Sequence, residues 1–509
     1  MISFKGQDII SIRDFSQEDL IFILNTTQQV KSKYPNNVSE LRELSKELKM
    51  KRVACLFFEP STRTRISSEV ALHDLEFYTD GFSTTEGTSV KKGEPLKDTA
   101  MMFQSYFNQA LFIRHPLEGS AKYVAETLEI PVVNCGDGKN QHPTQTILDL
   151  FSIRESQGRL ENLVIALVGD LKYGRTTHSL LIGLSKFPGI EVLLVCPEIL
   201  MMDKSYINYF KLKTGREPKF VPDLIEALSK ADIVYMTRIQ RERFPEGPEG
   251  DYEYKKVSGV YKLTKDLLEK AKPKQNMKIL HPLPRNKYNL EITFDVDATK
   301  YSYLYQQAQN GLFVRDTIGA LVLGLLGNEY EVKGEKEEYD FPRVIELEIK
   351  NRKFSREYYR LENGTLIDHL ERGKADDVKK ALSIDPLKYG NTILPINNLP
   401  STRYGLKDII GIEGIYLKET ELAKIALVSS RATINYIEGG KIKRKFKVSA
   451  PAEISGLVAC KNPDCITNPK HYEHVPTKFY NLQKDLNDFL VLKCAYCEKE
   501  ITREEIELL

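Results

Sequence analysis

RVACLFFEPSTRTR, residues 52–65, joins a short apolar run to a polar turn and the start of a helical pattern. The run 52–58 is typical of a buried strand. Ser61 or Thr62 can cap the N-terminus of the helix that follows. The first backbone N–H groups of such a helix attract anions, and Arg63 adds a fork-shaped donor. The stretch predicts a strand, a turn and a helix that hold a phosphate. Taken alone, it also fits an ordinary capped helix with solvated arginines.

The same alternation of apolar runs and helical patterns continues on both sides of this stretch. Helical spacing begins near Leu20, and the later segments follow in order: strands at 110–113, 132–133, 163–168, 192–195, 233–236 and 278–280, and helices at 121–128, 145–154, 176–186 and 224–230. Strands that alternate with helices over roughly 300 residues indicate doubly wound parallel sheets. We expect two such α/β domains, with ligands bound beyond the carboxyl ends of the strands.

The composition narrows the class of protein to which this chain can belong. The chain has 509 residues, of which 41% are hydrophobic and 28% charged, as in folded globular proteins. With 73 basic and 71 acidic side chains the net charge is only +2, so no global field favours nucleic acid or an anionic membrane. The N-terminus lacks a signal-peptide pattern, and no apolar stretch approaches the ~20 residues that cross a bilayer. We therefore expect a cytoplasmic protein.

The amino-acid composition changes after Gly327. Residues 328–340 contain six acids and few apolar groups, which favours a solvated linker over 328–352. Beyond it, β-branched runs at 392–396 and 432–437, mixed with helical patterns at 366–372 and 419–427, indicate an α+β domain over 353–449. Residues 450–509 form a small module that bears cysteines.

Polar side chains stand at the ends of the predicted strands in the first 330 residues. They are Arg114, His142, Gln145, Arg175, Arg238 and Gln240, and a cationic loop carries Ser89 and Lys92. Leu283 and Pro284 belong to a rigid proline turn after a further strand, which could present backbone carbonyls. Each alone also fits an ion pair, a helix cap or a solvated loop. Together they offer guanidinium groups, a histidine and hydroxyls, with no convincing nucleophile, metal ligand or nucleotide-binding glycine motif. Such a set suits acyl transfer from a phosphorylated donor.

Several of these motifs resemble those of the aspartate and ornithine carbamoyltransferases. Residues 61–65 resemble their carbamoyl-phosphate motif, and residues 114–116 and 142–145 match further motifs. The second half resembles the aspartate branch at 173–176, 236–240 and 281–284, where ornithine enzymes carry an His-Cys-Leu-Pro motif. The resemblance covers residues 1–327. It implies a carbamoyl-phosphate domain at 1–144, an aspartate domain at 145–292 and a helix at 293–327 that returns to the first domain.

The resemblance also implies roles for single residues. Those for carbamoyl phosphate are Ser61, Thr62, Arg63, Thr64, Ser89, Lys92, Arg114, His142 and Gln145; of these, Arg63, Thr64, Lys92, Arg114 and His142 are the implied catalytic groups. Those for aspartate are Lys92, Arg175, Arg238, Gln240, Leu283 and Pro284. Ser89 and Lys92 would come from an adjacent subunit, which implies a homotrimer or a larger homo-oligomer with shared active sites. No catalytic metal or organic cofactor is implied.

Four cysteines mark the last fifty residues. Cys460 with Cys465 and Cys494 with Cys497 form two close pairs, a spacing suited to one structural Zn²⁺ per chain. His471 and His474 lie between the pairs as competing ligands. A zinc ribbon can also bind nucleic acid, but the basic run 441–447 is more typical of a solvated strand face.

Residues 355–503 resemble the regulatory chain of aspartate carbamoyltransferase, through the motifs at 364–369, 432–437, 460–466 and 494–500. The chain thus resembles a fusion of catalytic and regulatory polypeptides. The resemblance implies nucleoside triphosphate effectors, with Asp368, His369, Asn435, Ile437 and Lys445 at the matching positions. One position departs from the family pattern, because Gly411 stands where the family has a lysine.

The expected activity is carbamoyl transfer from carbamoyl phosphate to L-aspartate, giving N-carbamoyl-L-aspartate and phosphate in pyrimidine synthesis. One alternative is a carbamoyltransferase for another amine such as ornithine. The other is a scaffold that senses nucleotides or binds nucleic acid and has an inactive catalytic half. Neither nucleic acid nor a membrane is an expected partner.

Overall fold

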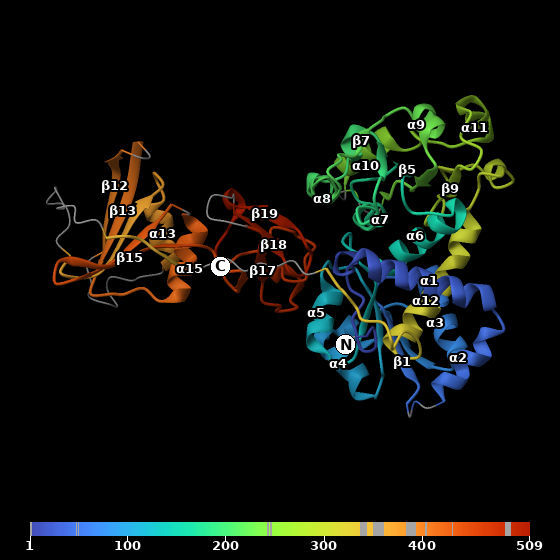
Figure 1. Cartoon of the computed structure of the whole chain (residues 1–509), viewed down its shortest axis with the longest axis horizontal. Coiled ribbons are helices and arrows are strands. Elements are labelled where there is room, and N and C mark those ends of the chain that lie inside the picture. The colour runs from blue at the N-terminus through green and yellow to red at the C-terminus, as the bar shows by residue number, and fades with distance from the viewer. Residues whose placement is uncertain are drawn as a thin grey trace. The chain divides into compact units, whose positions relative to one another are not determined.

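The computed structural model describes residues 3–46, 48, 50–241, 244, 247–335, 344–349, 361–382, 393–402, 405–429, 431–483 and 490–509. The chain divides into two compact units. The first covers Met1–Lys336, and the second contains nearly all of the chain from Glu337 onward. Each has its own buried apolar core, and Figure 1 colours them in chain order from blue to red.

The first half of the first unit is a four-stranded parallel sheet. Its strands are β1 (Arg52–Phe57), β2 (Tyr78–Phe82), β3 (Leu111–His115) and β4 (Val132–Asp137), in the order β2-β1-β3-β4. The helices of this half are α1 (Gln17–Lys33), α2 (Asn37–Ser45), α3 (Thr62–Asp74), α4 (Leu96–Ser105) and α5 (Ser120–Thr127). β1 has neighbours on both sides, and all of its residues after Arg52 are buried, which is why the run is apolar throughout.

The second half is a five-stranded parallel sheet. Its strands are β5 (Val164–Val168), β6 (Glu191–Val195), β7 (Lys219–Phe220), β8 (Ile233–Met236) and β9 (Lys278–Leu280), in the order β7-β6-β5-β8-β9. The helices are α6 (Pro143–Gln157), α7 (Arg175–Leu184), α8 (Lys204–Thr214), α9 (Leu224–Lys230), α10 (Pro248–Val257) and α11 (Lys265–Ala271). The predicted pair of doubly wound sheets is therefore confirmed.

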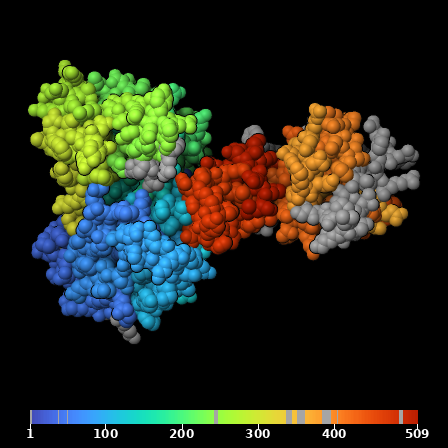
Figure 2. Space-filling view, turned by 180° about the vertical axis from the view of Figure 1, so that it is seen from behind, coloured from blue at the N-terminus to red at the C-terminus, as the bar shows by residue number. Residues whose placement is uncertain are grey.

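A long helix joins the two halves. α12 (Leu304–Val322) packs against α1, α3 and α6, and its start also contacts β9. Figure 1 shows it in yellow beside the blue helices, and Figure 2 shows the two halves as adjoining blue and green-to-yellow masses. In each sheet the strand order reverses at one point, between β1 and β3 and between β5 and β8. A crevice forms outside the carboxyl ends of strands at such reversals.

The residues after α12 differ from the expected linker. Residues 328–335 pack on α1: the Tyr330 ring stacks on Phe22 with centroids 3.9 Å apart, and the N–H groups of Lys333 and Gly334 donate to Asp19 at 2.9 and 2.8 Å. Glu335 forms ion pairs with Lys186 and Lys213. The described part of the expected linker, residues 328–335, therefore packs on the first unit. Further along, residues 344–346 form β10 of the second unit, while 336–343 and 350–352 lie outside the described residues.

Replacing Glu335 with glutamine should destabilise the first unit. The Lys186 side chain is 6% exposed, and an amide cannot neutralise its charge. We expect the free energy of unfolding to fall by about 1–3 kcal/mol, as measured by differential scanning calorimetry. The matched control is Glu331→Gln, because Glu331 is 52% exposed and pairs with Lys333; it should change stability by less than about 0.5 kcal/mol. Equal effects of the two variants would contradict the expectation.

The second unit contains two antiparallel sheets. The six-stranded sheet has the order β10-β15-β14-β11-β13-β12, and its strands are β10 (Val344–Glu346), β11 (Asn363–Leu370), β12 (Ile393–Ser401), β13 (Gly405–Glu413), β14 (Thr433–Glu438) and β15 (Lys441–Val448). Its apolar core lies between one face of this sheet and the helices α13 (Ala375–Leu382) and α15 (Glu419–Val428). The four-stranded sheet β16-β17-β18-β19 follows, with strands Glu453–Ser455, Lys478–Asn481, Val491–Cys494 and Glu500–Thr502.

One predicted helix in this unit is wrong. Residues 366–370 lie in β11, which pairs with both β13 and β14. The apolar residues Leu366, Ile367 and Leu370 have the spacing of a helix face, because a register shift between Ile367 and Leu370 breaks the strict alternation of a strand. The other expected elements there, the strand at 432–437 and the helix at 419–427, match β14 and α15 closely. In the part of the chain that the structure describes, no helix has the length and apolar character needed to span a membrane.

Candidate functional site

A cavity of about 860 Å³ lies at the carboxyl ends of the parallel strands of the first unit. Arg114 at the end of β3 and residues that follow β1, β4, β5, β8 and β9 line it, as expected near the two strand-order reversals. Twelve of the fourteen predicted site residues of this half are brought together there: Ser61, Thr62, Arg63, Thr64, Arg114, His142, Gln145, Arg175, Arg238, Gln240, Leu283 and Pro284. Among the described residues, five arginines and one carboxylate line the cavity, so it suits an anionic ligand.

The start of α3 forms one end of the cavity. Ser61 is the extended N-cap residue, and its side chain makes no capping hydrogen bond. No acidic residue occupies the first turn, so the positive end of the helix faces the cavity without a counter-charge of its own. Burial and the nearby charge of Arg238 lower the pKa of Arg63. The helix start and Arg63 together can hold a phosphate.

Glu59 connects two of the arginines. One of its carboxylate oxygens lies 3.3 Å from Arg114 and 3.4 Å from Arg175, whose side chains are each 11% exposed. Arg114 comes from the end of β3 and Arg175 from the start of α7, so this contact joins the two halves of the unit. Sequence reasoning placed Glu59 in the motif but assigned it no part in the site. Its position beside Pro60, directly after a buried strand, was the available signal.

His142 stands immediately before α6 and is 3% exposed. Its backbone N–H donates to the Ser179 hydroxyl at 3.3 Å. Burial, together with the charges of Arg175, Arg114 and Arg315, lowers the pKa of His142 well below 6.5. The imidazole is therefore neutral at pH 7 and can donate one hydrogen bond to a carbonyl oxygen without carrying a charge.

The low pKa of His142 predicts a pH-dependent stability. The native pKa lies below the unfolded value, so as pH falls below 6.5 the unfolded chain takes up the proton first, and this group's contribution to stability is lost. The difference in unfolding free energy between the wild type and His142→Gln should therefore fall, by at most about 1.4 kcal/mol per pH unit. Calorimetry of both proteins between pH 7 and 5 measures it. A constant difference would contradict a lowered pKa.

The other end of the cavity carries Arg175, Arg238 and Gln240. The Arg175 guanidinium donates to the Gly138 carbonyl at 2.7 Å. A Cβ at Gly136, where φ is +117°, would lie 3.0 Å from this guanidinium, so the glycine leaves it room. The backbone N–H of Gln240 donates to Asp170 at 3.3 Å. Two guanidinium groups and an amide at this end can bind a second anionic group.

Two predicted residues lie elsewhere on the chain. Ser89 and Lys92 are the ends of a short 3₁₀ helix, Ser89–Lys92, and both are exposed. Neither is among the described residues that line the cavity. The site of this chain alone therefore lacks the lysine that the sequence motif assigns to it.

α12 contributes two residues that sequence reasoning missed. Arg315 and Gln307 line the cavity, and Arg315 donates to the Thr144 hydroxyl at 3.3 Å. Both are nearly fully buried. The available signal was the presence of polar side chains inside an otherwise apolar helix, where they need partners.

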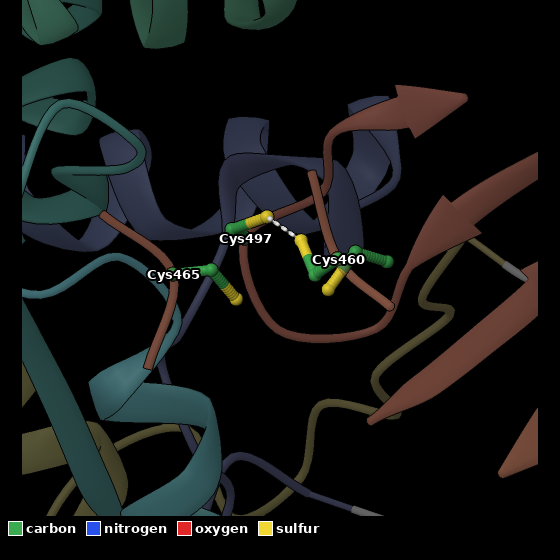
Figure 3. A group of neighbouring side chains, drawn as sticks. Cys460, Cys465 and Cys497 are labelled. Carbon is green, nitrogen blue, oxygen red and sulfur yellow. Dashed lines mark hydrogen bonds between the residues drawn. The ribbon is translucent and has the colours of Figure 1, made fainter. Parts of the chain in front are cut away.

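The last fifty residues hold a four-cysteine cluster. The sulfur atoms of Cys460, Cys465, Cys494 and Cys497 all lie within 4.8 Å of one another, and the Cys460 and Cys497 sulfurs are 3.6 Å apart. Figure 3 shows three of these side chains converging. A tetrahedral metal with bonds of about 2.3 Å places sulfurs roughly 3.8 Å apart, so the cluster fits a metal site. His471 instead places Nε2 2.8 Å from the Pro463 carbonyl oxygen.

Four of the five predicted nucleotide residues share one face of the six-stranded sheet. Asn435 pairs directly with Lys445 and with Leu366, and Asp368 and Ile437 lie two positions along their strands. Gly411 pairs with Leu366 on the other side, so the family's lysine position falls on this face as well. The Asp368 carboxylate is 2.5 Å from the Lys407 ammonium. Burial raises its pKa, but His369 and Lys407 outweigh this and lower it to about 2.

Models of known protein families match four consecutive segments of the chain. Residues 7–155 match the carbamoyl-P binding domain and residues 161–322 the Asp/Orn binding domain of aspartate/ornithine carbamoyltransferases. Residues 358–449 match the allosteric domain and residues 452–507 the metal binding domain of the aspartate carbamoyltransferase regulatory chain.

Individual relatives cover the first unit. The chain is 44% identical over 326 residues to the aspartate carbamoyltransferase catalytic subunit of Thermococcus kodakarensis, covering 64% of this chain and 100% of the relative. It is 47% identical over 323 residues to that of Photobacterium profundum, covering 63% and 98%.

Solved structures give the same result. The catalytic subunit of M. jannaschii aspartate transcarbamoylase superposes with a TM-score of 0.55 at 37% identity, covering 64% of this chain and 100% of that one. The Trypanosoma cruzi enzyme in complex with carbamoyl phosphate and aspartate has a TM-score of 0.57 at 30% identity, covering 63% and 98%.

Proposed function

Because the chain belongs to the aspartate carbamoyltransferase family and joins its catalytic and regulatory domains in one polypeptide, we propose that it transfers the carbamoyl group of carbamoyl phosphate to L-aspartate. One observation carries the proposal. A single cavity has a helix start with Arg63 at one end, two arginines with Gln240 at the other, and a neutral histidine near Arg114. The product is N-carbamoyl-L-aspartate, an intermediate of pyrimidine synthesis.

At the phosphate end, Ser61, Thr62, Arg63 and Thr64 hold the phosphate of carbamoyl phosphate. The first N–H groups of α3 and the Arg63 guanidinium match three anionic oxygens. Ser89 and Lys92 join them from an adjacent subunit, since both are exposed on a short helix that does not line its own cavity. This assignment makes the active unit a homotrimer or a larger homo-oligomer.

At the carbonyl, Thr64, Arg114 and His142 donate to the oxygen, and Gln145 accepts from the amino group. The aspartate amine attacks the carbonyl carbon, a C–N bond forms, and negative charge grows on the oxygen. The C–O bond to phosphate then breaks and the amine loses a proton. Groups fixed before the reaction stabilise that charge without reorganising, and this supplies much of the rate.

At the second end, Arg175, Arg238 and Gln240 bind the two carboxylates of aspartate, while Leu283 and Pro284 line the pocket beside them. Guanidinium groups pair with carboxylates in a bidentate way, which fixes the amine relative to the carbonyl. Ornithine offers an ammonium in place of the side-chain carboxylate. These arginines would repel it, so the cavity favours aspartate over ornithine as acceptor.

Phosphate release from carbamoyl phosphate, with L-aspartate or L-ornithine as acceptor, tests the proposal. We expect release with aspartate and none above background with ornithine. Arg238→Ala should raise the KM for aspartate more than that for carbamoyl phosphate. Release with ornithine alone would replace the substrate assignment, and no release with either, together with salt-sensitive binding of oligonucleotides, would favour an inactive scaffold.

Mixing two inactive variants tests the shared site. If Lys92 comes from a neighbouring subunit, each active site takes Arg114 from one chain and Lys92 from another. Lys92→Ala and Arg114→Ala then remove residues that different chains supply to the same site. Subunits exchanged by mild denaturation and refolding should then recover activity, because some sites in the mixed oligomer contain neither substitution. Recovery absent at every mixing ratio, with oligomers re-formed, would place Lys92 in its own chain's site.

In the last fifty residues, Cys460, Cys465, Cys494 and Cys497 hold one structural Zn²⁺ per chain, since four thiolates close a tetrahedral site and leave no position for substrate. The face with Asp368, Asn435, Ile437 and Lys445, together with the adjacent His369, binds a nucleoside triphosphate effector. Gly411 supplies no cation there, so affinity should be weaker than with a lysine. A nucleotide-dependent shift of the aspartate saturation curve with ATP or UTP tests this assignment.

A further inference from the structure

Asp149 is a buried acid that accepts hydrogen bonds from two residues lining the cavity, although it does not line the cavity itself. It lies on α6, one turn after Gln145, and is fully buried. One carboxylate oxygen, Oδ1, accepts from the amide nitrogens of Gln145 at 2.9 Å and Gln307 at 2.7 Å. The other, Oδ2, accepts from the Tyr235 hydroxyl at 2.8 Å. Three elements, α6, α12 and β8, therefore meet at one side chain.

An ionised carboxylate only accepts hydrogen bonds, so the side-chain amides of Gln145 and Gln307 must turn their nitrogen atoms toward Asp149. Because the nitrogen of Gln145 is held by Oδ1, the end of this amide that can turn to a ligand in the cavity is its oxygen. The oxygen of Gln307, fixed in the same way, accepts from the backbone N–H of His281 at 2.7 Å. His281 begins the segment with Leu283 and Pro284, which line the aspartate end.

We infer that Asp149 is a positioning residue that orients the Gln145 carbonyl toward the amino group of carbamoyl phosphate and, through Gln307, holds the segment of His281, Leu283 and Pro284. The inference rests on the proposed function, since it needs a ligand that carries an NH₂ group at this place. Without Asp149 the Gln145 amide can rotate by about 180° and present its NH₂ group. This group would then face the NH₂ group of carbamoyl phosphate, and two donors cannot form a hydrogen bond.

The network tolerates a change of charge on Asp149. Burial raises the pKa of Asp149 to about 7, against the hydrogen bonds from Gln307, Tyr235 and Gln145 and the charge of Arg315. A proton on Oδ2 can be donated to the Tyr235 hydroxyl oxygen, which leaves Oδ1 as the acceptor for both glutamines. The orientation of the two amides is thus the same in both protonation states.

Equilibrium binding of two ligands separates a positioning role from a merely structural one. Carbamoyl phosphate has the NH₂ group that Gln145 would accept from, whereas inorganic phosphate lacks it. In Asp149→Ala we expect affinity for carbamoyl phosphate to fall about tenfold, close to one lost hydrogen bond. Affinity for inorganic phosphate should stay within about twofold, because the phosphate contacts on α3 are unchanged. Asp149→Asn keeps one acceptor oxygen and should restore most of the difference.

Tyr235→Phe is the matched control. It removes the hydrogen bond to Oδ2 but leaves both bonds to Oδ1, so the ratio of the two affinities should equal that of the wild type. Equal losses for both ligands in Asp149→Ala, or the same altered ratio in Tyr235→Phe, would overturn the inference. A wild type that binds phosphate but not carbamoyl phosphate would instead refute the proposed function.

A second variant covers the case in which Asp149→Ala does not fold. Gln307→Met removes the acceptor of the His281 N–H but keeps the bond between Gln145 and Asp149. We expect the KM for aspartate to rise at least about fivefold, while affinity for carbamoyl phosphate stays within about twofold. Loss of carbamoyl phosphate affinity with an unchanged KM for aspartate would overturn the second half of the inference.

Discussion

Replacing Arg114 with alanine is expected to lower kcat for phosphate release by about 10²- to 10³-fold, the usual cost of losing one preorganised oxyanion donor. The Arg114 guanidinium lines the cavity at the end of β3 and is held by Glu59 at 3.3 Å. In the proposed reaction it donates to the carbonyl oxygen as negative charge grows there. Its effect should therefore fall on kcat more than on the KM for aspartate.

Arg65→Ala is the control for this prediction, because Arg65 belongs to the same sequence motif on α3 but pairs with Glu69 at 2.8 Å and does not line the cavity. Its kcat should remain within about twofold of the wild type. Arg114→Lys should recover only part of the loss, since an ammonium keeps the charge but not the planar fork. Similar rates for Arg114→Ala and Arg65→Ala would contradict the role assigned to Arg114.

The parallel sheets were predictable because their strands are buried on both faces. Each such strand is a continuous apolar run, and the polar residue after it marks the carboxyl edge where ligands bind. This is why Arg114, Arg175 and Arg238, far apart in the sequence, could be assigned to one site from local patterns. The pattern misled at β11, because the register shift between Ile367 and Leu370 gives the apolar residues of this strand the spacing of a short helix.

The missed residues depend on tertiary contacts that no local pattern records. Gln307 and Arg315 reach the cavity only because α12 returns from the second half to pack against α3 and α6. Residues 328–335 were misread for a related reason. Their acids suggested a solvated linker, yet Glu335 meets Lys186 and Lys213, which lie more than a hundred positions earlier. A charge pattern does not reveal whether its partner is water or a distant side chain.

Replacing Cys494 with serine is expected to remove the metal from the second unit. The three remaining thiolates cannot close the tetrahedral site, and losing a quarter of the 10–16 kcal/mol typical of structural zinc lowers affinity by about 10²- to 10³-fold. We expect the metal content to fall from one Zn²⁺ per chain to a small fraction after dialysis against a chelator. Hydrogen exchange in β17, β18 and β19 should rise sharply, because Cys494 ends the strand between the other two.

His471→Asn is the control for the metal prediction, since His471 lies between the two cysteine pairs in the sequence but contacts the Pro463 carbonyl oxygen. It should keep its zinc and its exchange protection. The first unit has a separate apolar core, so the exchange pattern of that core should be unchanged in Cys494→Ser. Zinc retained by Cys494→Ser but lost by His471→Asn would mean that the histidine, not the fourth thiolate, completes the site.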